Sequence, residues 1–123
     1  GLALIDTMQS LDCPVITVGE GVVASMAAVI LACGDHRQVY RHTQVLIHQL
    51  MGGTGMAQQT DIEIAAQHTA TMRAELDELL AEHGNLSARA FHELTERDCW
   101  CNAKRALELG LVDEVIAPSK KAL

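Results

Sequence analysis

The apolar and polar positions of the first half of the chain predict a helix, a strand, a second helix and two more strands. Near-helical spacing over residues 1–11 predicts the first helix, and it is carried by Leu2, Ile5, Met8 and Leu11. Residues 15–18 form a short apolar run, which is typical of a buried strand. Residues 24–33 are apolar on every side and predict a fully buried helix with Gly34 as its C-terminal cap. Short strands are predicted at 38–40 and 44–47, so this half is expected to be an α/β unit.

A long helix is predicted over residues 61–83, after a glycine-rich stretch at 51–55. Thr60 and Glu63 have the spacing of a capping box, which marks the start of a helix. Apolar and small residues then recur at alternating intervals of three and four, at Ile62, Ala65, Thr69, Met72, Leu76, Leu79 and His83. Such a narrow heptad seam on a charged helix predicts packing against another helix or another subunit.

The end of the chain predicts two short helices and a strand. Ser87 is the expected N-cap of a helix that runs to about residue 96. Asn102 is the expected N-cap of the last helix, which ends at Gly110, and a strand follows at 111–116.

Composition narrows the possible functions. The chain has 123 residues, of which 49% are hydrophobic and 20% charged, as expected for one folded domain over residues 1–123. A net charge of −7 and an aromatic content of 2% argue against nucleic acid and against an anionic membrane as partners. The longest apolar run, residues 22–33, is shorter than the span of about 20 that a membrane helix needs. Residues 118–123 are expected to fray.

The four cysteines, Cys13, Cys33, Cys99 and Cys101, match neither a CxxC pair nor a zinc pattern. We therefore expect no metal, and reduced, mostly buried thiols in a cytoplasmic protein. Cys99 and Cys101 are too close in sequence for an easy disulfide. The chain opens with no basic segment before an apolar stretch, so no secretory signal is expected.

Ser25 is a candidate nucleophile. It is the polar residue inside the apolar run, and it follows a glycine turn at the start of the predicted helix. A nucleophile at that position could use the backbone N–H of Met26 as an oxyanion donor. The alternative is that Ser25 only caps the helix, which is a common role for serine.

A serine nucleophile needs a base, and the base needs an acid that orients it. Among six histidines His48 is the candidate base, because it ends an apolar strand while the other five are more easily explained as surface residues. Asp98 is the candidate orienting residue, since it lies where a helix gives way to an apolar segment. Alternatively, His48 could be an edge histidine and Asp98 a solvated loop residue. The pattern alone does not decide.

Six segments occur in one order: residues 5–9 (IDTMQ), 24–28 (ASMAA), 47–49 (IHQ), 59–64 (QTDIEI), 95–98 (TERD) and 110–113 (GLVD). In this order, over residues 1–116, the chain closely resembles the ClpP family, the proteolytic subunits of ATP-dependent Clp proteases. The resemblance implies that Ser25 is the nucleophile, His48 the base and Asp98 the orienting acid. Met26 would then supply an oxyanion donor.

The resemblance also implies a ClpP/crotonase-like α/β fold, with stacked β-sheet and flanking helices, in a homo-oligomer of two face-to-face seven-membered rings. The helix at 61–83 would be the handle that interlocks the rings. Gly52 and Gly53 would bind extended substrate, and Glu96 and Arg97 would form an ion pair between rings. The chain itself would need no cofactor, because a separate Clp-type unfoldase uses ATP and delivers unfolded polypeptides.

The chain differs from the family pattern at its start. Family members carry several strands and a serine-proline-glycine-glycine turn before the segment matching 1–11, so the chain is expected to be an N-terminally truncated, C-terminal portion of the family domain. One of those glycines supplies the second oxyanion donor. Ala27 and Leu50 also replace the family's usual glycine and proline.

The function expected from these features is that of a serine endopeptidase subunit. The main alternative is a non-catalytic assembly subunit or inactive fragment, because part of the oxyanion hole would be lacking. A crotonase-fold enzyme acting on acyl thioesters is a third possibility, but such enzymes do not normally use a Ser–His–Asp triad.

Overall fold

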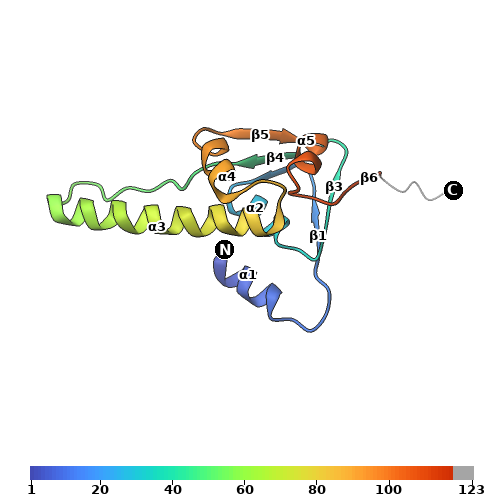
Figure 1. The fold of residues 1–123 in the computed structure, drawn as a ribbon, viewed down its shortest axis with the longest axis horizontal. Coiled ribbons are helices and arrows are strands. Elements are labelled where there is room, and N and C mark those ends of the chain that lie inside the picture. The colour runs from blue at the N-terminus through green and yellow to red at the C-terminus, as the bar shows by residue number, and fades with distance from the viewer. Residues whose placement is uncertain (118–123) are drawn as a thin grey trace.

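The computed structural model describes residues 1–117, so the expectation for residues 118–123 lies outside the described part of the chain. Helices and strands are interspersed along it (Figure 1). They are α1 (Leu2–Gln9), β1 (Ile16–Gly19), β2 (Val22–Ala24), α2 (Met26–Ala32), β3 (His36–Tyr40), β4 (Gln44–Ile47), α3 (Gln59–His83), α4 (Ala88–Leu94), β5 (Cys99–Asn102), α5 (Ala103–Glu108) and β6 (Glu114–Ile116).

The strands form two small sheets. One has the order β1-β3-β6 and is parallel throughout. The other has the order β2-β4-β5, in which β2 and β4 are parallel and β5 is antiparallel to β4. Parallel strands joined through helices confirm the α/β prediction.

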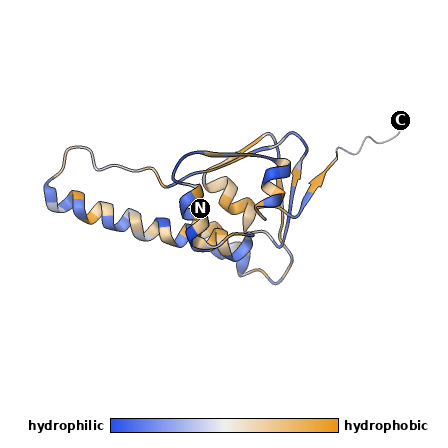
Figure 2. Ribbon diagram, turned by 45° about the horizontal axis from the view of Figure 1, so that its top comes forward, coloured by the Kyte–Doolittle hydropathy of each residue, from blue (hydrophilic) through white to orange (hydrophobic). Residues whose placement is uncertain are grey.

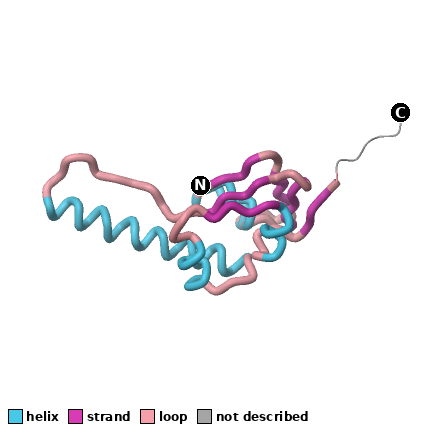
Figure 3. The backbone as a smooth tube through the Cα atoms, turned by 90° about the horizontal axis from the view of Figure 1, so that it is seen from above, coloured by secondary structure: helices cyan, strands magenta, loops and turns pink. Residues whose placement is uncertain are grey.

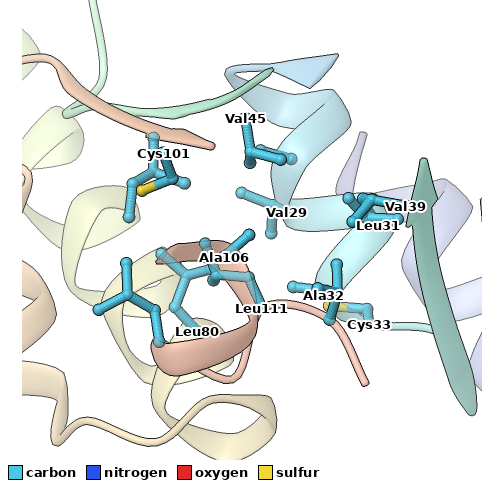
Figure 4. Close-up of a cluster of buried hydrophobic side chains, with 14 of the residues drawn as sticks. Val29, Leu31, Ala32, Cys33, Val39, Val45, Leu80, Cys101, Ala106 and Leu111 are labelled. Atoms are coloured by element: carbon cyan, nitrogen blue, oxygen red, sulfur yellow. The ribbon is translucent and has the colours of Figure 1, made fainter. Parts of the chain in front are cut away.

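The hydrophobic core lies around α2, between the two sheets and α3. Figure 4 shows Val29 of α2 near Val45 of β4, and Leu31 of α2 near Val39 of β3. Leu80 of α3 closes the other side of this core. The expectation that α2 is buried on every side is wrong in part, because its residue Ala27 is exposed.

Helix α3 is anchored at its C-terminal end and projects from the body of the molecule (Figures 1 and 3). Only Asp77 and Leu80 are buried among its 25 residues, whereas Ile62 and Ile64 near its start are 48% and 63% exposed. Figure 2 shows the projecting part as a mixture of hydrophilic and hydrophobic residues. The predicted seam is therefore packed within this chain only at its C-terminal end.

The start of α3 differs from the prediction. Its N-cap is Gln58, whose side chain makes no capping hydrogen bond, and Thr60 lies inside the helix. Glu63 accepts a hydrogen bond from the Gln59 side chain instead of completing a capping box. The capping box predicted for Thr60 and Glu63 is wrong because the helix begins two residues earlier, at Gln59 rather than at residue 61.

Other boundaries also differ. The apolar run at 22–33 contains the short strand β2, so α2 begins at Met26. The C-cap of α2 is Cys33, not Gly34. Gly34 is buried against the side chain of Thr17, which leaves no room for a Cβ atom. Strand β5 was not predicted, and β6 begins at Glu114, after a buried segment, rather than at residue 111.

A nearly buried arginine joins the ends of several elements. Nη1 of Arg37 donates to the carbonyl oxygens of Ala32, His83 and Gly110, which lie at the ends of α2 and α3 and before β6. Its guanidinium also pairs with the carboxylate of Asp113. This hydrogen bonding and charge lower the pKa of Asp113.

The four cysteines are all unbonded, as predicted. Cys33 and Cys101 are buried, Cys99 is half-buried, and Cys13 is exposed. Burial raises the pKa of the Cys33 thiol to about 11. No helix within residues 1–117 combines the length and the apolar character needed to cross a bilayer.

Candidate active site

The three predicted catalytic residues lie at one edge of the β2-β4-β5 sheet. Ser25 directly follows β2, His48 directly follows β4, and Asp98 directly precedes β5. The carboxyl ends of the parallel strands β2 and β4 meet at this edge, where the antiparallel strand β5 begins. Ile47 pairs with Cys99, so the next step of the same register sets His48 opposite Asp98.

Ser25 occupies a strained turn between β2 and α2. With φ 60° and ψ −129°, it is the one non-glycine residue with positive φ among residues 1–117. Such a conformation costs about 1–3 kcal/mol and persists only where the surroundings enforce it. Here the Ser25 amide donates to the Leu46 carbonyl at 2.9 Å, while the Ser25 carbonyl accepts the first bonds of α2.

The Ser25 side chain does not cap the helix. Ser25 holds the N-cap position, but its hydroxyl accepts no hydrogen bond from α2, so the capping interpretation is wrong. The exposed hydroxyl is therefore available at the turn. Met26 is the first residue of α2, and its N–H has no intrahelical acceptor. A sharp strand-to-helix turn of this kind also exposes the nucleophile of hydrolases with another fold.

Ser25 and His48 both line a cavity of about 410 Å³. Much of its wall is apolar and comes from α2, β4 and α3, including Val29, Ile47, Leu76 and Leu80. His48 is half-buried at this cavity, and Asp98 is exposed and lies outside its lining. Within the described chain no hydrogen bond joins the side chains of Ser25, His48 and Asp98. The structure thus gathers the three residues at one edge in an unassembled arrangement, which is common in sites without substrate.

An arginine that the sequence did not single out connects the segments that carry His48 and Asp98. Nη1 of Arg73 donates to Oε1 of Gln49 at 3.0 Å, and Nη2 donates to Oε2 of Glu96 at 3.0 Å. Gln49 directly follows His48, and Glu96 precedes Asp98 by two positions. We call Arg73, Gln49 and Glu96 the Arg73 network.

Backbone contacts extend the Arg73 network. The Gln49 amide donates to the Thr95 carbonyl at 3.1 Å, and the Gln49 side-chain amide donates to the Glu96 carbonyl at 2.9 Å. Nη2 of Arg73 also donates to the His92 carbonyl at 3.0 Å. The hydrogen bond from Arg73 and its positive charge lower the pKa of Glu96. In the sequence Arg73 is one charge on a charged helix, so no local signal distinguishes it.

A buried carboxylate also borders the cavity. Asp77 of α3 is 5% exposed, and its Oδ2 lies 2.7 Å from Nδ1 of His92. A buried carboxylate requires such a partner. His92 was expected to be a surface residue, and it is in fact an exposed residue that satisfies Asp77.

The substrate contacts predicted for Gly52 and Gly53, and the ring contacts predicted for Glu96 and Arg97, remain predictions. Glu96 pairs with Arg73 within the chain, and Arg97 is exposed. Gly52 and Gly53 lie in the exposed loop before α3 and line a hollow of about 690 Å³ beside that helix. A Cβ atom at either glycine would meet nothing within 4 Å, so contacts inside this chain do not require glycine there.

No group of three or more His, Cys, Asp or Glu side chains within residues 1–117 is arranged to hold a metal ion.

Comparisons with known proteins agree with the resemblance found in the sequence. Residues 1–119 match the Clp protease family. Over 120 residues the chain is 42% identical to proteins named ATP-dependent Clp protease proteolytic subunit from the Hungary19A-6 and CGSP14 strains of Streptococcus pneumoniae. Each alignment covers 95% of this chain and 61% of the relative, so the chain spans about 61% of the length of these curated relatives.

Proposed function

The chain belongs to the Clp protease family, and from that premise we propose that it is a serine endopeptidase subunit that hydrolyses peptide bonds of unfolded proteins. The observation that carries the proposal is the strained turn at Ser25, which exposes an uncapped hydroxyl at the cavity that His48 also lines. Strain of this kind is concentrated at functional sites because a merely structural residue has no need of it.

In the proposed reaction, the Ser25 hydroxyl attacks the carbonyl carbon of the scissile peptide bond. His48 takes the hydroxyl proton and then gives it to the leaving amine, while Asp98 holds the imidazole in the required tautomer. The N–H of Met26 donates to the oxyanion that forms, a contact typically worth about 10²–10³ in rate. The reaction needs the side chains of Ser25, His48 and Asp98 to approach to hydrogen-bond distance, and the strand register supports this for His48 and Asp98.

The proposed substrate is an extended, unfolded polypeptide. The open space beside Gly52 and Gly53 allows a substrate backbone to approach the loop closely, as in the addition of a strand to an exposed edge. The apolar wall of the 410 Å³ cavity favours an apolar substrate side chain next to the scissile bond.

The proposed assembly is a homo-oligomer of two heptameric rings, in which residues 1–123 act as a single domain. The exposed Ile62 and Ile64 on the projecting part of α3 support a role for that helix between subunits. Glu96 and Arg97 are proposed to contribute to the contact between rings. A separate Clp-type unfoldase would use ATP, and this chain would use no cofactor. Four unbonded cysteines support a reducing compartment, for which we propose the cytoplasm.

Labelling with a fluorophosphonate, read by intact mass, tests the catalytic role. We expect a single adduct that disappears in Ser25→Ala. The matched control is Ser10→Ala, because Ser10 is also exposed but lies at the end of α1. No adduct on a chain whose circular dichroism shows that it is folded would refute the proposed catalysis and favour the non-catalytic assembly subunit.

A further inference from the structure

Strand β5 carries two thiols on one face. The Sγ atoms of Cys99 and Cys101 lie 3.7 Å apart, which is van der Waals contact for sulfur. Trp100 lies between them in sequence and is 55% exposed, whereas Cys101 is fully buried. This is the alternation expected of a strand with one buried face. The pair lies directly after Asp98, on strand β5, which pairs with the strand that His48 directly follows.

We infer that Cys99 and Cys101 are a redox modification site, which a peroxide oxidises to a reversible disulfide that disrupts the start of β5. The effect on catalysis rests on the proposed function, but formation of the disulfide does not.

The reaction takes two steps and consumes one peroxide. The Cys99 thiolate attacks one peroxide oxygen, so that an S–O bond forms, the O–O bond breaks, and hydroxide or alkoxide leaves. The Cys101 sulfur then attacks the sulfur of the Cys99 sulfenic acid. The S–S bond forms, the S–O bond breaks, and the oxygen leaves as water with the proton of Cys101. Two thiols are oxidised by two electrons in total, and the peroxide is reduced by the same two.

Exposure determines the order of the two steps. Cys99 is half-buried and can meet a small peroxide, while Cys101 has no exposed surface. Burial, and secondly the neighbouring Cys99, raises the pKa of the Cys101 thiol, which makes it the less reactive of the two toward peroxide. Cys99 is therefore the residue that is attacked first, and Cys101 is the resolving residue.

The disulfide cannot form on an undistorted strand. Two residues on the same face of a strand are separated by about 6.7 Å along it. A disulfide holds its Cβ atoms about 3.5–4.5 Å apart, so the backbone around Trp100 must shorten by about 2 Å. This shortening conflicts with the pairing of Cys99 with Ile47 and of Cys101 with Val45. Oxidation therefore displaces Asp98 from its position opposite His48, and the strain makes the bond easy to reduce.

Mapping of thiols after treatment with hydrogen peroxide tests the inference on the wild-type chain. After oxidation, the chain is unfolded in urea and alkylated with iodoacetamide, because Cys33 and Cys101 are buried in the folded chain. We expect Cys13 and Cys33 to carry the label while Cys99 and Cys101 remain unlabelled and linked within one peptide. Dithiothreitol should restore labelling of both. Because Trp100 is the single tryptophan of the chain, its fluorescence should change with the same kinetics.

Two variants act as controls. Cys99→Ser should abolish the fluorescence change, and Cys13→Ser should keep it, because Cys13 is exposed but lies before β1. Full alkylation of Cys99 and Cys101 in the peroxide-treated wild type would overturn the inference, whatever the variants do.

Fluorophosphonate labelling separates the inference from the proposed function. We expect oxidation to lower the labelling rate of Ser25 by at least about tenfold, since a triad without its orienting acid loses far more. Equal rates in the reduced and oxidised chains would overturn the link between β5 and Asp98. If the reduced chain never reacts, the proposed function fails, and the disulfide and the change at Trp100 still decide the redox site.

Discussion

Replacing Arg73 with methionine tests whether the Arg73 network holds the segments of His48 and Asp98 together. Methionine keeps most of the apolar stem and removes the guanidinium. The substitution therefore deletes the hydrogen bonds to Gln49, to Glu96 and to the His92 carbonyl, each of which is 3.0 Å long.

The expected loss of stability follows from these contacts. The bonds from the charged guanidinium to Gln49 and to the His92 carbonyl together contribute about 3 kcal/mol. The pair with Glu96 adds little, because that carboxylate is exposed to solvent. Nε of Arg73 is buried without a hydrogen-bond partner among residues 1–117, so removing this atom raises the free energy of unfolding by about 1 kcal/mol. We expect the free energy of unfolding to fall by about 2 kcal/mol.

The expected effect on reactivity is larger than the effect on stability. Without the Arg73 guanidinium, the segments of His48 and Asp98 are still joined by the pairing of β4 with β5 and by the bonds from Gln49 to the Thr95 and Glu96 carbonyls, but no side chain of α3 fixes the Gln49 and Glu96 side chains relative to each other. A displacement of about 1 Å between catalytic groups can lower a rate by about 10²-fold. We therefore expect Arg73→Met to lower the fluorophosphonate labelling rate of Ser25 by about that factor, and hydrogen exchange at the Gln49 amide to become faster.

Arg73→Lys is the matched control. Lysine keeps the charge but cannot bridge Gln49 and Glu96 in a fixed planar geometry, so an intermediate labelling rate is expected. A loss of about 2 kcal/mol leaves a stable domain almost entirely folded, and unfolding alone cannot explain a 10²-fold effect. If Arg73→Met labels at the wild-type rate and exchanges Gln49 at the wild-type rate, the network does not position the site.

Three further predictions concern stability, each measured by urea denaturation. Ser25→Gly should be about 1 kcal/mol more stable than Ser25→Ala, because only glycine relieves the positive φ; equal stabilities would show that the turn is unstrained. The pKa of Asp113 is lowered in the folded state, so its contribution is present above its unfolded pKa of about 4 and is lost as pH falls through the folded pKa. Asp113→Asn should therefore be less stable at neutral pH and lose less stability on acidification, and a parallel pH dependence would contradict this. Asn102→Ala should cost about 1 kcal/mol, since the Asn102 side chain caps α5, whereas Gln58→Ala should cost nothing because Gln58 makes no capping bond; the reverse order would refute the assignment of caps.

Local chemistry explains which helix ends could be predicted. Ser87 and Asn102 each accept a hydrogen bond from the backbone amide three residues later, as their sequence contexts indicate. Thr60 and Glu63 have an equally good pattern, yet α3 already begins at Gln59. Glutamine is a good helix former, and nothing before Thr60 stops the helix from starting earlier.

The two strands that were not predicted, β2 and β5, lack a distinct strand pattern in the sequence. Strand β2 has three residues and is separated from the apolar helix α2 by Ser25 alone, so the two elements appear in the sequence as one apolar run. Strand β5 has four residues and places a tryptophan on its exposed face. Both strands are defined by pairing with β4, and such long-range pairing leaves little trace in a short segment.

The residues of the candidate site likewise differ in whether the sequence predicts them. Ser25 and His48 could be found from the sequence because each interrupts an apolar segment, and the structure brings both to one cavity. Arg73 and Asp77 could not, because their partners Gln49, Glu96 and His92 come from other elements. On a charged helix, a residue that pairs with side chains of other elements has the same local sequence around it as a residue that faces water.

The projecting helix α3 has a mechanical consequence. Its 25 residues span about 37 Å, and the packed region around Leu80 is its fixed end. Arg73 lies about 10 Å from Leu80 along the axis, whereas Gln59 at the tip lies about 31 Å away. If the helix pivots as a rigid rod, a lateral movement of about 3 Å at the tip moves Arg73 by about 1 Å. A binding partner that displaces the N-terminal end of α3 by about 3 Å therefore changes the spacing between the His48 and Asp98 segments by about 1 Å, without contact with either residue.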